Sequence, residues 1–199
     1  MVLLLAIVAG LLAGIGWARW RGQPYQPPEF KYLWLVLVAF LPQYIFVYLP
    51  LTRRLFPNWS VVGFLLTSQI LLLVFVWINR RVLGMSVLLF GLLLNLAVMT
   101  VNGGFMPISQ QTASRLVSGD TMRGLSLGSR FGAKDILLSP ADTRLEWLAD
   151  RFLPPTWFSY QVAFSVGDVF IALGVFWLLA KPESSIQFSK PAIKRGLSI

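Results

Sequence analysis

Five long stretches of the chain are apolar and almost free of charge, and this pattern limits the possible folds more than any other feature. Four of the stretches contain no Asp, Glu, Lys or Arg, and the fifth contains Asp168 alone. A helix rises about 1.5 Å per residue, so about 20 residues cross the ~30 Å hydrocarbon core of a bilayer. The stretches therefore predict membrane-spanning helices at about 2–18, 33–51, 60–79, 84–101 and 160–180.

The fold class that follows is an all-α integral membrane protein, a bundle of about five transmembrane helices with an ordered extracytoplasmic loop that contains short amphipathic helices. We expect one transmembrane domain over 1–180, in which 102–159 forms an extracytoplasmic cap, followed by a basic cytoplasmic tail over 181–199. Of the 199 residues, 56% are hydrophobic and 13% are charged, whereas soluble domains carry about 25% charged residues. These values exclude a soluble enzyme and a disordered chain.

Lysine and arginine are distributed unequally between the two predicted sides of the membrane. Segments 19–32, 80–83 and 181–199 share one side and hold nine cations against two acids, whereas the other side holds Arg53, Arg54 and the nearly neutral cap. Because cytoplasmic loops carry an excess of Lys and Arg, we expect the C-terminus inside the cell and the N-terminus outside. The first apolar run lacks the basic start and A-x-A-like site of a signal peptide, so we interpret it as a retained anchor. The net charge of +9 follows from this asymmetry, and we expect no nucleic-acid partner.

The chain contains no histidine and no cysteine. Their absence excludes His or Cys ligation of zinc, haem or iron–sulfur clusters, and it excludes Ser-His-Asp and Cys-His catalysis. We therefore expect no cofactor and no metal site, and any acid–base chemistry would depend on carboxylates, Lys, Tyr or hydroxyl groups.

Small residues recur at intervals of four in two of the predicted helices. Ala6, Gly10 and Gly14 form a stripe on the first helix, and Ala163 and Gly167 form a shorter one on the last. Small residues let two helix backbones approach closely in a membrane. The stripes indicate either packing within the bundle or a docking face for another membrane subunit.

Four predicted helices carry a polar side chain near their middle: Gln43, Gln69, Asn95 and Asp168. An unpaired polar group in hydrocarbon costs several kcal/mol, so we expect these side chains to contact one another. Asp168 is expected about eight residues into the last helix, and carboxylates inside membranes often have functions. The group forms either a structural hydrogen-bond network or the lining of a polar cavity or translocation path.

The cap begins with Asn102-Gly103-Gly104-Phe105-Met106-Pro107. This run predicts a sharp turn, because glycine tolerates backbone angles closed to other residues and proline fixes its own φ. Next, Ser109 is expected to cap a short helix that reaches Ser118 and ends at Gly119.

A second cap helix is predicted over 140–152, amphipathic and lying flat on the outer membrane surface. Its acidic residues recur at intervals of four: Asp142, Glu146 and Asp150. They form either a solvated acidic face paired with Arg144 and Arg151 or an oxygen-ligand site for Ca²⁺ or Mg²⁺. We expect the cap to fold back over the outer end of the last helix near Asp168. Asp168 is then protonated, hydrogen-bonded to Asn or Gln, or reached by a loop arginine such as Arg144 or Arg151.

These motifs and the arrangement of spans resemble a bacterial membrane family known as domain of unknown function 5317, over nearly the whole chain. The motifs that carry the resemblance are the turn at 102–107, Asp142-Thr143-Arg144-Leu145, and Phe164-Ser165-Val166-Gly167-Asp168 followed by Ile171-Ala172-Leu173-Gly174. The resemblance implies a multi-pass protein of the bacterial cytoplasmic membrane, and it implies no activity.

The last predicted helix is also similar to that of lipoprotein signal peptidase, an intramembrane aspartyl protease with the pattern Phe-Asn-x-Ala-Asp-x-x-Ile-x-x-Gly. The matching residues are Phe164, Asp168, Ile171 and Gly174, with Asp150 in the place of the upstream aspartate. Ser165 and Gly167 depart from the pattern, and the Asn-Arg motif of the peptidase is absent. The similarity implies two carboxylates that share a proton and activate water.

Taken together, the sequence favours a non-enzymatic accessory or scaffold subunit of a larger membrane assembly, because it has small-residue stripes and lacks a complete catalytic set. One alternative is an aspartyl hydrolase that uses Asp150 and Asp168. The other is a carrier of small molecules or lipids that uses the four polar mid-helix side chains. The expected partners are membrane lipids and other membrane subunits.

Overall fold

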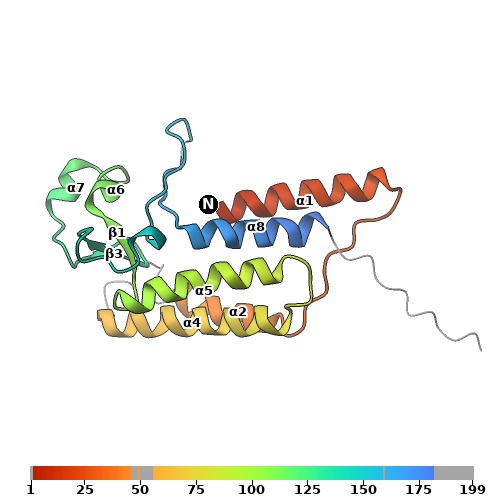
Figure 1. Ribbon diagram of the computed structural model, residues 1–199, viewed down its shortest axis with the longest axis horizontal. Helices are drawn as coiled ribbons and strands as arrows, with labels where there is room; N and C mark the ends of the chain where they lie inside the picture. Colours follow the sequence, from red (N-terminus) through yellow and green to blue (C-terminus); the bar gives the residue numbers. More distant parts are fainter. Residues whose placement is uncertain (1, 46–48, 50–55, 159, 182–199) are drawn as a thin grey trace, which may run out of the picture.

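Five apolar helices lie side by side in the computed structural model, which describes residues 2–45, 49, 56–158 and 160–181 (Figure 1). The helices are α1 (Val2–Trp20), α2 (Trp34–Gln43), α4 (Asn58–Ile78), α5 (Met85–Val101) and α8 (Val166–Ala180). Each falls on one of the predicted spans. The predicted loop with Arg53 and Arg54, part of the second span, and the tail from 182 to 199 lie outside the described residues.

Two of these helices, α1 and α4, are long and apolar enough to cross a membrane by length and composition. The other three are apolar but shorter, at 10 residues for α2, 17 for α5 and 15 for α8. The mostly helical fold expected from the sequence is therefore present, and two of its helices meet the criterion for a membrane span.

The helices pack in the order α1, α8, α5, α4 and α2 (Figure 1). The carboxyl end of α5 and the amino ends of α4 and α8 lie at the same end of the bundle, beside the small sheet. The cap predicted between α5 and α8 therefore sits against one end of the helices.

Glycines allow the close contact between α5 and α8. A Cβ atom on Gly91 would lie 2.6 Å from the Gly167 carbonyl oxygen, and one on Gly174 would lie 2.7 Å from the Leu88 backbone nitrogen. Such distances leave no room for a methyl group, because the neighbouring atoms belong to the backbone.

The stripe on α1 faces α8. Ala6, Gly10 and Gly14 are the buried residues of α1, and a Cβ on Gly10 would meet the Phe176 carbonyl oxygen at 3.0 Å. The stripe therefore packs within the chain, which favours the first of its two interpretations. Ala163 does not belong to such a stripe, because it precedes α8 and packs against the apolar core of the cap.

The cap contains a three-stranded sheet in the order β1-β3-β2. The strands are β1 (Met106–Ser109), β2 (Arg130–Phe131) and β3 (Asp135–Leu138), with β3 parallel to β1 and antiparallel to β2. The sequence predicted only helices in the cap, so these strands correct that expectation. They are short, and β1 pairs with a strand more than 20 residues away, which a local pattern does not reveal.

Two short helices, α6 (Gln110–Ala113) and α7 (Gly119–Arg123), accompany the sheet. Ser109 caps α6 as predicted, accepting a hydrogen bond of 3.1 Å from the Thr112 N–H. The helix ends much earlier than Ser118, and Gly119 begins α7 instead of ending α6.

The predicted amphipathic helix over 140–152 is absent. The segment forms turns and one 3₁₀ turn, η2 (Glu146–Leu148). The reason is tertiary: the Asp150 N–H donates to the Pro107 carbonyl at 3.0 Å, so the chain runs beside β1 instead of coiling. The three predicted acidic positions do not share a face, since Asp142 and Glu146 are exposed and Asp150 is buried.

An apolar core joins the cap to the helices. Its fully buried residues come from α4, α5, the start of the cap and η2: Val61, Leu65, Val98, Met99, Phe105, Met106 and Leu148. The cap is therefore packed onto the ends of α4 and α5.

Candidate functional site

A capping box begins α8 and contains the acid that the sequence singled out. The Asp168 N–H donates to Ser165 Oγ, and the Ser165 N–H donates to Asp168 Oδ2, both at 3.1 Å. Asp168 thus lies in the first turn of α8, not about eight residues along the helix. The predicted start at 160 is wrong because the chain between Phe152 and Phe164 forms a loop, and the first helical residue is Val166.

Asn95 of α5 links this helix start to the bundle. Asn95 Nδ2 donates to Asp168 Oδ1 at 2.8 Å, and Ser165 Oγ donates to Asn95 Oδ1 at 2.9 Å. Both the Asn95 and Ser165 side chains are buried, so their hydrogen-bonding groups satisfy one another away from water.

The other two polar mid-helix residues stand apart from this pair. Gln69 Nε2 lies 3.9 Å from Met99 Sδ, and Gln69 Oε1 is buried without a hydrogen-bond partner in the described part of the chain. Gln43 is buried on α2. The structure therefore joins Asn95 to Asp168, whereas the contacts it describes do not link them to the two glutamines.

Lys134, in the turn between β2 and β3, is the cation beside Asp168. Its Nζ atom lies 2.8 Å from Asp150 Oδ2, 3.9 Å from Asp135 Oδ1 and 4.0 Å from Asp168 Oδ2. We call Lys134 and these three aspartates the lysine cluster. The expected loop cation was Arg144 or Arg151, and the sequence reasoning missed Lys134. The signal available in the sequence was Gly132, because glycine favours tight turns. In the structure, Gly132 has a φ of 62° in the hairpin turn that brings Lys134 back to the helices.

Burial and mutual charge decide the protonation of the lysine cluster. Burial raises the pKa of Asp135 to about 8, an increase that Lys134 opposes and Asp150 reinforces. Burial likewise raises the pKa of Asp150, against the attraction of Lys134. Burial alone would lower the pKa of Lys134, but the three carboxylates outweigh it and raise that pKa well above its usual value. At neutral pH, Lys134 is therefore charged and Asp135 keeps its proton.

The Asn102 side chain ties the turn after α5 to the second motif of the cap. Asn102 Oδ1 accepts from the Arg144 N–H at 2.9 Å, while Nδ2 donates to the carbonyls of Arg144 and Val98, each at 2.8 Å. Arg144 thus contributes its backbone to this contact. Gly103 and Gly104 adopt φ values of 78° and 89°, which the sharp turn requires.

The remaining motif residues also serve the shape of the cap. Pro107 is fully buried in β1 and accepts the hydrogen bond from Asp150 through its carbonyl. Asp142 is exposed and accepts a hydrogen bond of 2.6 Å from Ser139 Oγ. Gly167 lies against Asn95, where a Cβ atom would strike the Asn95 side chain.

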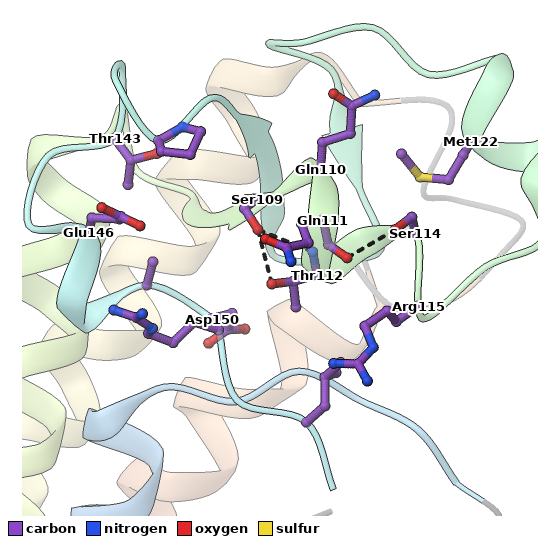
Figure 2. Close-up of a pocket in the computed structure, with 14 residues that line it drawn as sticks. Ser109, Gln110, Gln111, Thr112, Ser114, Arg115, Met122, Thr143, Glu146 and Asp150 are labelled. Atoms are coloured by element: carbon purple, nitrogen blue, oxygen red, sulfur yellow. Dashed lines mark hydrogen bonds between the residues drawn. The ribbon is translucent and has the colours of Figure 1, made fainter. Parts of the chain in front are cut away.

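An open pocket of about 700 Å³ lies in the cap, between α6 and the 140–153 segment (Figure 2). One wall comes from α6 and its neighbours, including Gln111, Thr112 and Arg115, and the other from the 140–153 segment, including Glu146 and Arg151. Its size falls within the range of about 300–1,000 Å³ that is common for ligand sites. Asp150 also lines the pocket, although its side chain is only 1% exposed.

Chemically, the lysine cluster is an ion-paired group that keeps one proton. The Lys134 and Asp168 side chains are 31% and 27% exposed, so water reaches the cluster from their side, whereas Asp150 is enclosed. Among the described residues, no group of three His, Cys, Asp or Glu is arranged to hold a metal ion. The cation at the centre of the carboxylates is the ammonium group of Lys134.

Comparison with known proteins places the chain in a family. The family model described as "Family of unknown function (DUF5317)" matches residues 28–180, more than half of the chain. The chain therefore belongs to this family, as the motifs indicated. One relative is an uncharacterized protein of Thermotoga maritima, which is 29% identical over 148 residues, or 74% of this chain and 79% of that protein. No solved structure matches the chain.

Proposed function

We propose that this member of the DUF5317 family is a multi-pass protein of the bacterial cytoplasmic membrane, and that it serves as a non-enzymatic accessory or scaffold subunit of a larger membrane assembly. The observation that carries the proposal is that Lys134 fills the space among the three aspartates of the lysine cluster. Three aspartates converge there, but Lys134 lies between them and hydrogen-bonds Asp150. On this proposal, the acids stabilise the cap instead of activating a substrate.

The arrangement of the helices supports the membrane part of the proposal. The ends of α4, α5 and α8 that carry the cap lie together (Figure 1), as an alternating path through a bilayer would require. On this path, the segments rich in Lys and Arg fall at the opposite end, which the positive-inside rule assigns to the cytoplasm. The cap then faces away from the cytoplasm.

The pocket of the cap is the surface that we assign to a partner. Two exposed arginines, Arg115 and Arg151, line it together with amide and hydroxyl side chains. A polar rim with arginines is common in protein interfaces. The small-residue stripe of α1 is already covered by α8 and no longer supports docking of another subunit.

Gentle detergent extraction followed by native gels and pull-down tests the accessory role. Partners should co-purify with the native chain and should be reduced in the double variant Arg115→Ala, Arg151→Ala. Arg123→Ala is the matched control, because Arg123 is an exposed cap arginine that pairs with Asp120 and does not line the pocket. A native chain that migrates alone from several detergents would contradict the proposal.

An aspartyl hydrolase is the second candidate, and one observation favours it. The two acids that resemble the peptidase pair, Asp150 and Asp168, do converge on the same ammonium group. Asp150→Asn and Asp168→Asn should then each abolish cleavage of a lipoprotein precursor, and cleavage that persists in either variant would end this candidate. A carrier has less support, because the described contacts do not join Gln43 and Gln69 to Asn95 and Asp168.

A further inference from the structure

A closed loop connects the cap to α8. The Phe152 N–H donates to the Phe164 carbonyl at 3.1 Å, and the Phe164 N–H donates back to Phe152 at 2.9 Å. The two rings stack with their centroids 5.7 Å apart. We call residues 153–158 and 160–163, which these contacts enclose, the aromatic loop.

Internal hydrogen bonds shape the aromatic loop. Gln161 Nε2 donates to the carbonyls of Phe158 at 2.7 Å and Pro155 at 3.1 Å. The Phe158 N–H also donates to the Pro155 carbonyl at 3.0 Å, which forms a turn. The loop therefore has a defined turn before it meets any partner, which reduces the entropy lost on binding.

The surface of the aromatic loop is apolar, aromatic and uncharged. No charged residue occurs from Phe152 to Gly167. Trp157 is 79% exposed and Tyr160 is 64% exposed, so both rings are largely uncovered within the chain. An uncharged surface of this kind enters a less polar medium without the cost of desolvating an ion.

The loop leaves the bundle sideways. In Figure 1, it projects across the helix axes at the level where α1 and α8 begin, whereas the sheet and α6 lie beyond the starts of α1 and α8, beside the ends of α4 and α5, and α7 lies still further out. If α1 and α8 cross a bilayer, their amino ends, and the loop beside them, lie at the boundary between the hydrocarbon core and water. Trp and Tyr are enriched at this boundary because one part of each ring system is apolar and the other forms hydrogen bonds.

We infer that the aromatic loop binds the lipid bilayer by inserting Trp157 and Tyr160 into the headgroup region of the outer leaflet. This inference rests on the proposed membrane path. The neighbouring helices expose large apolar side chains, such as Leu4 and Leu12 of α1 and Leu173 of α8. Lipid that covers these side chains would also reach the loop, so lipid, and not a second protein, is the occupant that we assign. The loop would anchor the cap against the membrane beside α1 and α8.

Depth measurement with spin labels tests the inference. The chain has no cysteine, so single variants can be labelled without further changes and reconstituted in vesicles of phosphatidylethanolamine and phosphatidylglycerol. Thr156→Cys places the label next to the native Trp157. Leu37→Cys, at a position of α2 that is 71% exposed, marks the bilayer interior, and Ser126→Cys marks the exposed cap surface.

The label at 156 should show a ratio of oxygen to nickel-chelate accessibility several-fold above that at 126 and below that at 37. Adding Trp157→Ser and Tyr160→Ser should shift it towards the value at 126. If the label at 156 has the same accessibility ratio as the label at 126, while the label at 37 lies deep in the bilayer, the inference fails and the membrane path holds. If the label at 37 is also exposed to water, the membrane path itself fails. Shielding of 156 from both reagents would show contact with a second copy and would overturn the lipid assignment.

Discussion

Two junctions of this molecule are stabilised by different physical effects. Where α8 meets α5, the backbones approach through Gly91, Gly167 and Gly174, and the contact depends on the absence of side chains. Where the cap meets the helix ends, the contact includes a charged lysine, three aspartates, of which Asp135 is protonated at neutral pH, and the amide of Asn95. The first junction should tolerate changes of pH and reject an added methyl group, and the second should respond to both charge and pH.

The largest effect is expected from Lys134→Met. This change leaves Asp150, which is 1% exposed, without its cation, and removing one partner of a buried pair costs about 3–5 kcal/mol. Denaturant titration of the cap, followed by a fluorescent label at position 126, measures the loss. Arg123→Met is the control, because both partners of its ion pair are exposed and such pairs contribute little. Equal stability of the two variants would show that the cluster does not hold the cap.

The helix junction should be most sensitive to Gly91→Ala. The new Cβ would lie 2.6 Å from the Gly167 oxygen and 2.7 Å from the Ile171 nitrogen. The helices would have to separate, at a cost of about 1–3 kcal/mol. Gly63→Ala is the matched control, since nothing lies within 4 Å of its Cβ position. Unfolding in mixed detergent, followed by circular dichroism, compares them, and equal stability would refute the close packing.

Asn102→Ala tests a neutral contact of the cap. It removes three hydrogen bonds, two of them to the backbone of Arg144. Unpaired buried groups cost about 1–3 kcal/mol, so the cap should be destabilised by that order. Thr100→Ala, an exposed position on the same helix that bonds only its own turn, should change little. The same denaturant titration decides between them.

The pH dependence of the cap follows from Asp135. Its pKa is about 8 in the folded chain and about 3.9 in an unfolded one, so the folded state holds more protons between these values. Its contribution to stability is complete below about pH 4 and is lost as the pH rises through 8. We expect the free energy of cap unfolding to fall by about 2 kcal/mol from pH 6 to pH 8.

Asp135→Asn should flatten this slope, because the amide stays neutral throughout. The exposed Asp120→Asn should leave it unchanged. A slope that survives in Asp135→Asn would assign the proton to another carboxyl, such as Asp150, whose pKa is also raised. The helix junction should show no such dependence over this pH range.

The two junctions also differ in how well the sequence predicts them. Long apolar runs indicate helices directly, so the five bundle helices could be placed from the sequence, and the small-residue stripe on α1 marks the face that packs on α8. The start of α8 was placed at 160 because the residues before it are uncharged and mostly apolar, yet the described residues from 152 to 164 form a loop. The capping box of Ser165 and Asp168 was a local signal for the true boundary.

The cap was much harder to predict because its contacts are distant in sequence. The pairing of β1 with β3 and the bond from Asp150 to Pro107 override the helical pattern of 140–152. The sequence did indicate that a cation of the cap could lie near Asp168. The identity of that cation depended on a hairpin that brings Lys134, rather than Arg144 or Arg151, to Asp168.

Hydrogen exchange by mass spectrometry on Lys134→Met in detergent tests the central claim most directly. The claim is that Lys134 and its aspartates stabilise the cap where it meets α8, whereas the helix junction depends on close backbone packing. We predict that the amides of Met106, Leu137 and Asp150, which bond within the cap, lose protection while those of α5 keep it. Native protection of these three amides in the variant would contradict the claim, and so would a simultaneous loss in α5.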